Sequence, residues 1–559
     1  MLELINRDAA GRICKFTVNK KTIETPNICI VINPNIQLIS PQEMKSKFNT
    51  NIIITNSYII DKSKYKKNVL DDGLHKFLKF DGIIYTDSGV YQMYSQRIKD
   101  INQDQILEFQ QKIGSDIITP VDLFTLPEDS RKIAQIKLKE TMKRISSARK
   151  KIDKYLVAPI QGGMYLDLRK NACKQASKLN PDLFAIGGIV PLMEQYRFKE
   201  LCDIIITCKK NLPSNKIIHA FGAGHPMIFS LLIAIGVDLF DSAMYALAAK
   251  RNGYLTEHGT YNLNDLSYFP CSCPICSTYT PEQVRQMPQV EKEKILAMHN
   301  LYVTYSEINT IKQAIKNNSL WELVQQRVRA HPSLLEALKH ILKKHKNYFL
   351  KKDLFTKKTA FFELGEESKY RPEVIRAKKM LKNVKSKNHV LLKPFGKIPP
   401  ELLLVYPFGQ SVLLSKKPLD IKIDSKKAVK MIIKYQYNSK INTDFNVEVS
   451  KKTGRIRRIW KNKKLLGTIR ANDGLFLPTI EGAKYINMKK IIVNKEALEY
   501  VKEGKSLFAK FVDKCDDFVP GEEIAITDGK KIIALGKAML NSDEIKEFEK
   551  GVAIKTRKV

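Results

Sequence analysis

The sequence lacks several features that would place it in other protein classes. Nowhere in its 559 residues does an apolar run approach the roughly 18 residues of a transmembrane helix, so we expect no membrane span. The amino-terminal stretch MLELINRDAAGRICKF has no basic region followed by a long apolar region, and we expect no signal peptide. The nine cysteines show no disulfide-like pairing. That pattern fits a reducing compartment and predicts a cytoplasmic protein.

Acidic residues are also scarce, with 58 Asp and Glu against 95 Lys and Arg, giving a net charge of +37. No low-complexity tail carries this excess, so it must lie on folded surfaces. Charge of this size favours a nucleic acid over a small anionic substrate. A lysine-biased proteome is the alternative explanation, and the many Lys, Ile and Asn residues are compatible with it. The length and the 43% apolar content predict a globular chain of roughly three or four domains.

The cysteines that are present cluster. Three of them fall within six residues, in the stretch YFPCSCPIC, and a histidine follows on a helical run, giving C-x-C-x2-C-x22-H. The four residues are Cys271, Cys273, Cys276 and His299. Three thiolates and one imidazole suit tetrahedral zinc, and four protein ligands indicate one closed, structural ion. The alternative is a set of buried free thiols, but the other six cysteines are scattered.

Short apolar runs alternate with helical stretches up to about residue 245. The runs cover 51–55, 82–87, 115–122, 155–161, 183–188, 217–222 and 237–241. Continuous apolar runs of this kind predict parallel strands covered on both faces. Seven or eight such units predict a (β/α)8 TIM-type barrel, and a doubly wound sheet is the alternative. Residues 1 to about 50 are expected to form a small β-rich segment that precedes the barrel.

Polar or glycine residues end most of these runs: Asp87, Asp122, Gln161, Gly188, Gly222 and Asp241. Parallel strands point the same way, so these residues would gather at one mouth of the barrel, where barrel enzymes place their active sites. A single strand-end Asp more often caps the next helix. Three aspartates and a glutamine at one end favour a catalytic site.

The remaining chain predicts smaller domains. We expect a catalytic barrel at 1–355 with a zinc subdomain at about 265–345, then domains at 356–425, 426–486 and 487–559. The third is predicted to be a small α+β module. The last is strand-rich with basic edges, which fits a small β-barrel that binds nucleic acid, or else a structural or dimerisation domain.

Several motifs together resemble one family. LHKFLKFDGIIYTDSGVYQM (74–93), IGSDIITPVD (113–122), PIQGG (159–163), FAIGGIVP (184–191), FGAGHP (221–226) and the CSCPIC cluster are similar to archaeal tRNA-guanine transglycosylases of the archaeosine type. The similarity covers essentially the whole chain, and 488–559 resembles a PUA domain. It implies a zinc-containing barrel, a pentosyltransferase activity and a homodimer. The implied reaction replaces guanine at position 15 of the tRNA D-loop by 7-cyano-7-deazaguanine (preQ0).

Base exchange with retention needs two carboxylates, one attacking C1′ and one transferring protons. The resemblance places these at Asp241, as nucleophile, and Asp87, as general acid/base, although the reverse assignment stays open. It also implies that Asp122 contacts the base by accepting hydrogen bonds from the purine N–H and amine. The other residues that it implies in substrate binding are Ser88, Tyr91, Gln161, Gly188, Ile189 and Val190.

RNA contact in the PUA-like segment is predicted at Lys505, Phe508 and Lys510, with Phe508 alternatively a core residue. Two other functions remain as alternatives. One is a non-catalytic or later-step tRNA-binding paralogue in archaeosine synthesis, which the intact aspartates oppose. The other is a queuosine-type enzyme acting at the anticodon, which the long carboxy-terminal extension opposes.

Overall fold

The structure, a computed structural model, describes residues 2–90, 102–153, 155–409 and 423–557. It divides into two compact units, each considered by itself. The first comprises Met1–Asn6, Gly11–Ile315 and Gln326–Leu338, and the second comprises Arg7–Ala10, Lys316–Gln325 and Lys339–Val559. Within the described ranges, no helix combines the length and apolar character needed to span a membrane.

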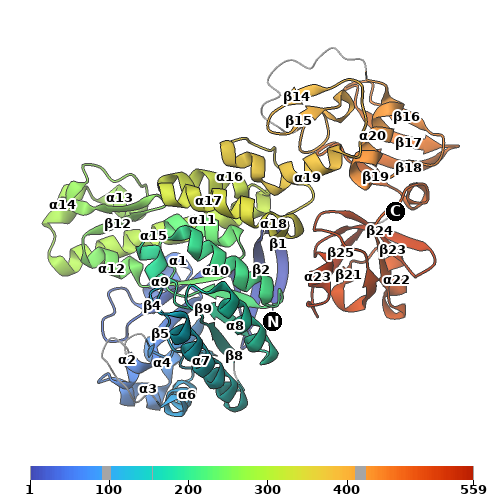
Figure 1. Ribbon diagram of the computed structural model, residues 1–559. Helices are drawn as coiled ribbons and strands as arrows, with labels where there is room; N and C mark the ends of the chain where they lie inside the picture. Colours follow the sequence, from blue (N-terminus) through green and yellow to red (C-terminus); the bar gives the residue numbers. More distant parts are fainter. Residues whose placement is uncertain (1, 91–101, 154, 410–422, 558–559) are drawn as a thin grey trace. The chain divides into compact units, whose positions relative to one another are not determined.

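Eight parallel strands close into a barrel in the first unit, which confirms the predicted barrel over the doubly wound sheet (Figure 1). They are hydrogen-bonded in the order β10-β11-β4-β5-β6-β7-β8-β9. The strands are β4 (Asn27–Ile32), β5 (Ile52–Asn56), β6 (Ile83–Asp87), β7 (Ile117–Ile118), β8 (Tyr155–Ile160), β9 (Leu183–Ile186), β10 (Ile217–Ala220) and β11 (Leu239–Ser242).

Two barrel strands differ from the sequence prediction. The segment expected to precede the barrel, residues 1 to about 50, contains the barrel strand β4. Cys29 of β4 pairs with Asp241 of the neighbouring strand β11. The run at 115–122 forms a strand only over Ile117–Ile118. Pro120 lacks a backbone N–H, so a strand cannot continue through it with full pairing.

The barrel interior is an apolar core closed at one end by a three-stranded sheet. This sheet is β1 (Leu2–Asp8), β2 (Gly11–Val18) and β3 (Lys21–Thr25). Its residues Phe16 and Val18 join one buried cluster with inward-facing barrel residues such as Tyr85. Tyr155, at the start of β8, donates to the carbonyl of Thr17 at 3.1 Å, so the sheet covers the amino-terminal ends of the strands. This sheet does not cover the opposite mouth of the barrel, at the carboxyl-terminal ends of the strands.

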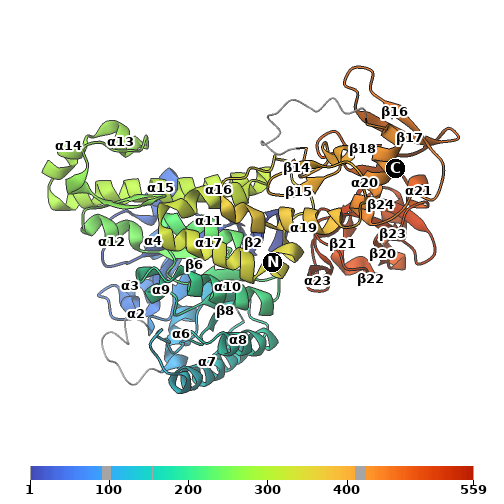
Figure 2. The same ribbon diagram turned by 45° about the horizontal axis from the view of Figure 1, so that its top comes forward.

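Helices surround the strands on the outside of the barrel (Figures 1 and 2). In α7 (Arg131–Lys151) the buried positions Ala134, Leu138 and Ile145 recur at helical spacing, and Ser130 caps the start. The other helices of this part are α1 (Pro41–Phe48), α2 (Ser57–Asp61), α3 (Lys66–Asp72), α4 (Leu74–Leu78), α6 (Gln103–Lys112), α8 (Leu166–Lys178), α9 (Val190–Glu194), α10 (Phe198–Asn211), α11 (Pro226–Ala234) and α12 (Met244–Lys250).

A cysteine-containing excursion follows the last barrel strand. It consists of the hairpin β12 (Gly253–Thr256) and β13 (Gly259–Asn262), the short helices α13 (Pro274–Thr278) and α14 (Pro281–Gln286), and α15 (Gln289–Asn317). Both views place α13 and α14 beside one end of α15 (Figure 2). Helices α16 (Leu320–Arg327), α17 (Pro332–Lys344) and α18 (Lys346–Lys352) come next along the chain.

Three sheets rich in antiparallel pairing form the described part of the second unit. Helices α19 (Pro372–Leu381) and α20 (Ser425–Tyr437) accompany a two-stranded sheet, β14 (Val390–Leu392) and β15 (Gly396–Ile398), and a four-stranded sheet, β16 (Asn446–Val449), β17 (Ile456–Lys461), β18 (Lys464–Ile469) and β19 (Phe476–Pro478). A six-stranded sheet follows, in the order β21 (Leu507–Phe508), β25 (Val552–Arg557), β24 (Ile532–Ala538), β23 (Glu523–Thr527), β20 (Lys490–Val493) and β22 (Val512–Cys515).

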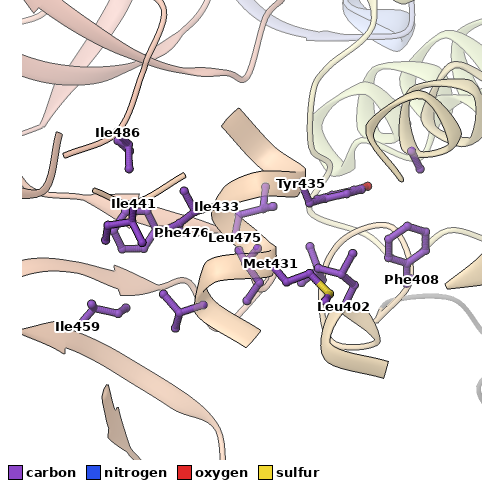
Figure 3. Close-up of a cluster of buried hydrophobic side chains, with 14 of the residues drawn as sticks. Leu402, Phe408, Met431, Ile433, Tyr435, Ile441, Ile459, Leu475, Phe476 and Ile486 are labelled. Atoms are coloured by element: carbon purple, nitrogen blue, oxygen red, sulfur yellow. The ribbon is translucent and has the colours of Figure 1, made fainter. Parts of the chain in front are cut away.

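One continuous hydrophobic core joins these smaller parts. It runs from Phe361 to Leu535 in the sequence and includes residues of α20 and the four-stranded sheet. Figure 3 shows Met431, Ile433 and Tyr435 of α20 beside Leu475. The smaller segments of the second unit therefore stabilise one another through shared apolar burial.

Candidate functional site

Polar side chains collect at the carboxyl-terminal mouth of the barrel, as predicted. Asp87 is the last residue of β6, Asp241 lies in β11, and Gln161 directly follows β8. Asp122 lies four residues after β7 and Gly188 two residues after β9. Because the strands form one closed parallel barrel, their carboxyl ends surround a single opening. Tyr91 lies outside the described residues.

Asp87 occupies an environment that favours its protonated form. Its Oδ2 accepts a hydrogen bond from the backbone N–H of Gly89 at 3.2 Å. Burial, together with the nearby carboxylates of Asp122 and Asp241, raises the pKa of Asp87 to about 7. The neighbouring Ser88 is wholly buried, and its Oγ has no hydrogen-bond partner among the described residues. A carboxyl group tuned in this way can both give and take a proton near neutral pH.

Asp241 is held in a different way, by two donors on one oxygen. His219 Nε2 lies 2.8 Å from Oδ1, and the backbone N–H of Gly222 donates to the same atom at 2.7 Å. Since the carboxylate is the acceptor, we assign the His219 proton to Nε2. His219 is wholly buried in β10, with its ring 4.6 Å from that of Phe221 and 5.6 Å from that of Tyr85. Among the described residues, both donors therefore hold Oδ1.

His219 was not among the residues predicted from the sequence. In the run IIHAFG it lies within an apolar strand, and only barrel closure brings β10 beside β11. Its signal was a lone titratable side chain at an inward-facing position of an otherwise apolar strand. That pattern by itself more often marks a satisfied core histidine.

Asp122 and Gln161 form a polar pair on the other side of the mouth. Gln161 Nε2 donates to Asp122 Oδ2 at 2.5 Å. Burial raises the pKa of Asp122, and the hydrogen bond from Gln161 opposes that shift. The remaining carboxylate and amide acceptors suit the donor edge of a guanine-like base. A Cβ on Gly187 would lie 2.4 Å from Gln161 Nε2, so a side chain there would displace the amide that donates to Asp122.

The loop after β9 brings backbone groups to the same region. Gly188 has φ of +68°, and a Cβ on it would lie 2.7 Å from the carbonyl oxygen of Thr125. Ile189 is buried, and Val190 begins α9. A Cβ on Gly222 would lie 2.4 Å from Val190 Cγ2, so this loop approaches the residue that donates to Asp241. The predicted base contacts and the predicted nucleophile therefore belong to one site.

The cysteine cluster forms a separate centre. Ligand atoms of Cys271, Cys273, Cys276 and His299 all lie within 4.8 Å of one another. His299 Nδ1 is 3.3 Å from Cys276 Sγ and 3.5 Å from Cys273 Sγ, and those two sulfurs are 3.6 Å apart. Tetrahedral bonds of about 2.3 Å would separate two ligand atoms by about 3.7 Å, so these four residues could hold one metal ion.

Outer contacts orient the histidine of this cluster. Its other nitrogen, Nε2, lies 2.9 Å from the carbonyl oxygen of Leu255, which directs Nδ1 toward the sulfurs. The ring of Tyr254 stacks on His299 with centroids 3.7 Å apart, and its hydroxyl lies 3.2 Å from Cys276 Sγ. The hairpin β12–β13 therefore fixes the ligand from α15.

The predicted RNA-contact residues lie on the surface of the carboxy-terminal sheet region. Phe508 is 45% exposed in β21, so the alternative that it is a core residue is wrong. Lys510 is exposed, with its Nζ 4.5 Å from the ring of Phe511. Lys505 is exposed too, but its Nζ pairs with Glu503 at 2.7 Å. Phe508 and Lys510 are thus the more accessible pair.

Comparison with known protein families finds matches along most of the chain. The family described as queuine tRNA-ribosyltransferase matches residues 8–333, and the PUA domain matches residues 489–559. Between them, a C1 domain of tRNA-guanine transglycosylase dimerisation matches 354–416, and a patch-forming domain C2 of tRNA-guanine transglycosylase matches 427–490.

Full-length relatives agree with these matches. The tRNA-guanine(15) transglycosylase of Pyrococcus furiosus is 44% identical, over 100% of this chain and 97% of its own. Those of Thermococcus kodakarensis and Methanocaldococcus jannaschii are 42% and 40% identical, over 100% and 99% of this chain and 98% of theirs. With the closed barrel and its ring of strand-end carboxylates, these matches show that the chain belongs to the tRNA-guanine transglycosylase family.

Proposed function

We propose that the protein exchanges guanine at position 15 of the tRNA D-loop for 7-cyano-7-deazaguanine, in archaeosine synthesis. The observation that carries the proposal is the pair of carboxylates in contrasting environments, Asp87 and Asp241, beside a purine-recognition pair at the same mouth. The name shared by the full-length relatives supports the position in the tRNA.

The contrast between the two carboxylates supports Asp241 as nucleophile. Its two donors hold it as an oriented carboxylate, and Oδ2 would attack C1′ of the nucleotide. The bond from C1′ to N9 of guanine breaks as the ester bond from C1′ to Asp241 forms. Asp87, with a pKa of about 7, would protonate the departing guanine.

The second half of the reaction reverses these roles. The N9–H of the incoming base gives its proton to the carboxylate of Asp87, and N9 attacks C1′. The ester bond to Asp241 breaks, and the carboxylate is restored. Two inversions retain the configuration at C1′, and one residue serves as acid and then as base.

The other polar groups would select the base. Asp122 would accept from the ring N–H and the exocyclic amine, which distinguishes guanine-like bases from adenine. Gln161 and the backbone at Gly188–Val190 would meet the carbonyl oxygen and the 7-substituent. Tyr91 would stack on the base, and Ser88, which lies beside Asp87 in the sequence, would contact the substrate.

We propose zinc as the ion held by Cys271, Cys273, Cys276 and His299, because three thiolates and one imidazole are a characteristic donor set for zinc. Four protein ligands leave no coordination site for a substrate or water. When bound, the ion would hold hairpin β12–β13, the cysteine loop and α15 together, and would take no part in the exchange.

The remaining parts would bring the tRNA to the site. We propose a catalytic domain at 1–355 and RNA-directed domains at 356–425, 426–486 and 487–559. The net charge of +37 and the PUA match support tRNA binding there, and the C1 match, by its description, supports a homodimer. The reduced thiols of the cluster support a cytoplasmic site of action.

The test uses purified protein, preQ0 and tRNA transcripts labelled in their guanines. Label should leave transcripts that carry G15, and a transcript with adenine at position 15 should keep it. Release from position 34 would instead establish the queuosine-type alternative. No release from any transcript, with tRNA still bound, would establish the non-catalytic paralogue.

A further inference from the structure

Arg169 of α8 lies wholly buried beneath the loops that follow β8 and β9. Its Nη1 donates to the carbonyl oxygen of Ile160 at 2.6 Å and to that of Gly187 at 2.9 Å. Ile160 immediately precedes Gln161, and Gly187 immediately precedes Gly188. One side chain therefore joins the two loops that carry the proposed base contacts.

Burying the guanidinium of Arg169 costs desolvation free energy that packing alone would not require. Within the described part of the chain, Arg169 has no carboxylate partner, and its third hydrogen bond runs from Nε to the carbonyl oxygen of Gly163 at 3.0 Å. A buried cation without a counter-ion is costly, and an apolar side chain of similar length would avoid that cost. An apolar side chain could not, however, hold three carbonyl groups in fixed positions.

Arg169 also lies close to Gly188 and Gln161, two of the residues proposed to contact the base. A Cβ built on Gly188 would lie 3.5 Å from Arg169 Nη2 and 3.1 Å from Gln161 Oε1. Both of these atoms are buried and have no hydrogen-bond partner among the described residues. A donor and an acceptor without a hydrogen-bond partner among the described residues thus lie beside the same glycine.

We propose that Arg169 is a positioning residue for base recognition. By fixing the carbonyls of Ile160 and Gly187, it sets where the Gln161 amide and the Gly188 backbone meet the incoming base. This inference rests on the proposed function, because it concerns the same pocket. Its consequence is specific: losing Arg169 impairs base binding and the preference for a 7-substituted base more than it impairs the carboxylate chemistry.

The experiment compares wild type with Arg169→Lys and Arg169→Met, using full-length protein and saturating G15 tRNA. KM and kcat are measured separately for preQ0 and for guanine. Lysine keeps the charge but cannot span three carbonyl groups, so we expect its KM for preQ0 to rise roughly 10-fold, and that of the Met variant roughly 100-fold. We expect kcat at saturating base to change less than KM, and the preQ0-to-guanine preference to fall.

Arg12 offers a matched control within the same unit. It is a buried arginine of β2 that donates to the carbonyl oxygen of Lys216 at 2.6 Å and pairs with Asp238, at the other end of the barrel. Arg12→Lys should lower Tm without changing the KM for either base. If Arg169→Lys lowers Tm and leaves KM and base preference unchanged, Arg169 is merely structural and the inference fails.

The activity of the wild-type protein tests the proposed function separately from the role of Arg169. Wild-type protein that exchanges neither base defeats the proposed function itself. Wild-type activity combined with an unaltered Arg169→Lys variant defeats only the positioning role. If Arg169→Met does not fold, the lysine variant carries the test.

Discussion

At the scale of single residues, the two catalytic candidates differ in how their charge is held. His219 and Gly222 both donate to Asp241 Oδ1, whereas Asp87 accepts from backbone N–H groups and is destabilised as an anion by burial and by its carboxylate neighbours. We therefore expect Asp241→Asn to abolish a denaturation-resistant protein–tRNA adduct, seen as a band shift in a denaturing gel. Asp87→Asn should still form some adduct, but more slowly. An adduct that survives in Asp241→Asn and vanishes in Asp87→Asn would reverse the two roles.

The pKa of Asp87 predicts a pH dependence of the first half-reaction. Departure of guanine needs Asp87 protonated, and burial and its neighbours raise its pKa to about 7. The single-turnover rate of guanine release should therefore fall as the pH rises through about 7. Rapid-quench measurements between pH 5.5 and 9 would show this. In Asp87→Asn the residual rate of guanine release should no longer fall as the pH rises through about 7. An unchanged fall in this variant would mean that another group titrates.

The same shift has a consequence for stability with a definite sign. The folded pKa of Asp87, about 7, exceeds its unfolded value near 4, so the folded state binds the extra proton between these values. Stability contributed by the protonated group is complete below about pH 4 and is lost as the pH rises through 7. Asp87→Asn should thus be more stable than wild type at pH 8, with the difference in Tm vanishing near pH 4. A constant difference across this range would contradict the assigned pKa.

At the scale of elements, the cysteine cluster should govern folding of the excursion after β11. The ligands come from the segment around α13 and from α15, and hairpin β12–β13 supports His299. Cys273→Ser should lose one metal ion per chain, measured by plasma mass spectrometry, and lower Tm by several degrees. Cys515→Ser changes a cysteine of β22 outside the cluster and should keep the ion. Full metal content in Cys273→Ser would show that the cluster does not hold the ion in the proposed way.

The elements also show what the sequence could and could not predict. Continuous apolar runs, without alternating polar residues, predicted most of the barrel strands. The polar residues that follow these runs predicted the position of the barrel mouth. Strand β4 was missed because its run lies among the hairpins of the first residues, and β7 proved short because Pro120 interrupts pairing. His219 and Arg169 were missed for another reason: their roles depend on contacts that exist only after the barrel closes.

At the scale of the whole molecule, the charge of +37 and the exposed Phe508 predict how the tRNA is held. Phosphate contacts release counter-ions, so kcat/KM for tRNA should fall steeply with salt, while KM for the free base should not. Phe508→Ala removes an aromatic surface on which a base could stack, a contact of about 1–3 kcal/mol. We expect it to raise the tRNA KM roughly 10-fold and to leave kcat at saturating tRNA unchanged.

The control for this prediction separates RNA contact from general loss of apolar surface. Leu391 is 72% exposed in β14 of the same unit but outside the PUA match, and Leu391→Ala should leave the tRNA KM unchanged. Lys510→Gln should add to the effect of Phe508→Ala and should reduce the salt slope by about one, as expected for one lost phosphate contact. Equal tRNA KM values in wild type and Phe508→Ala would exclude this edge of the sheet as an RNA contact. Positive charge elsewhere on the molecule would then have to bring guanine 15 to the aspartates.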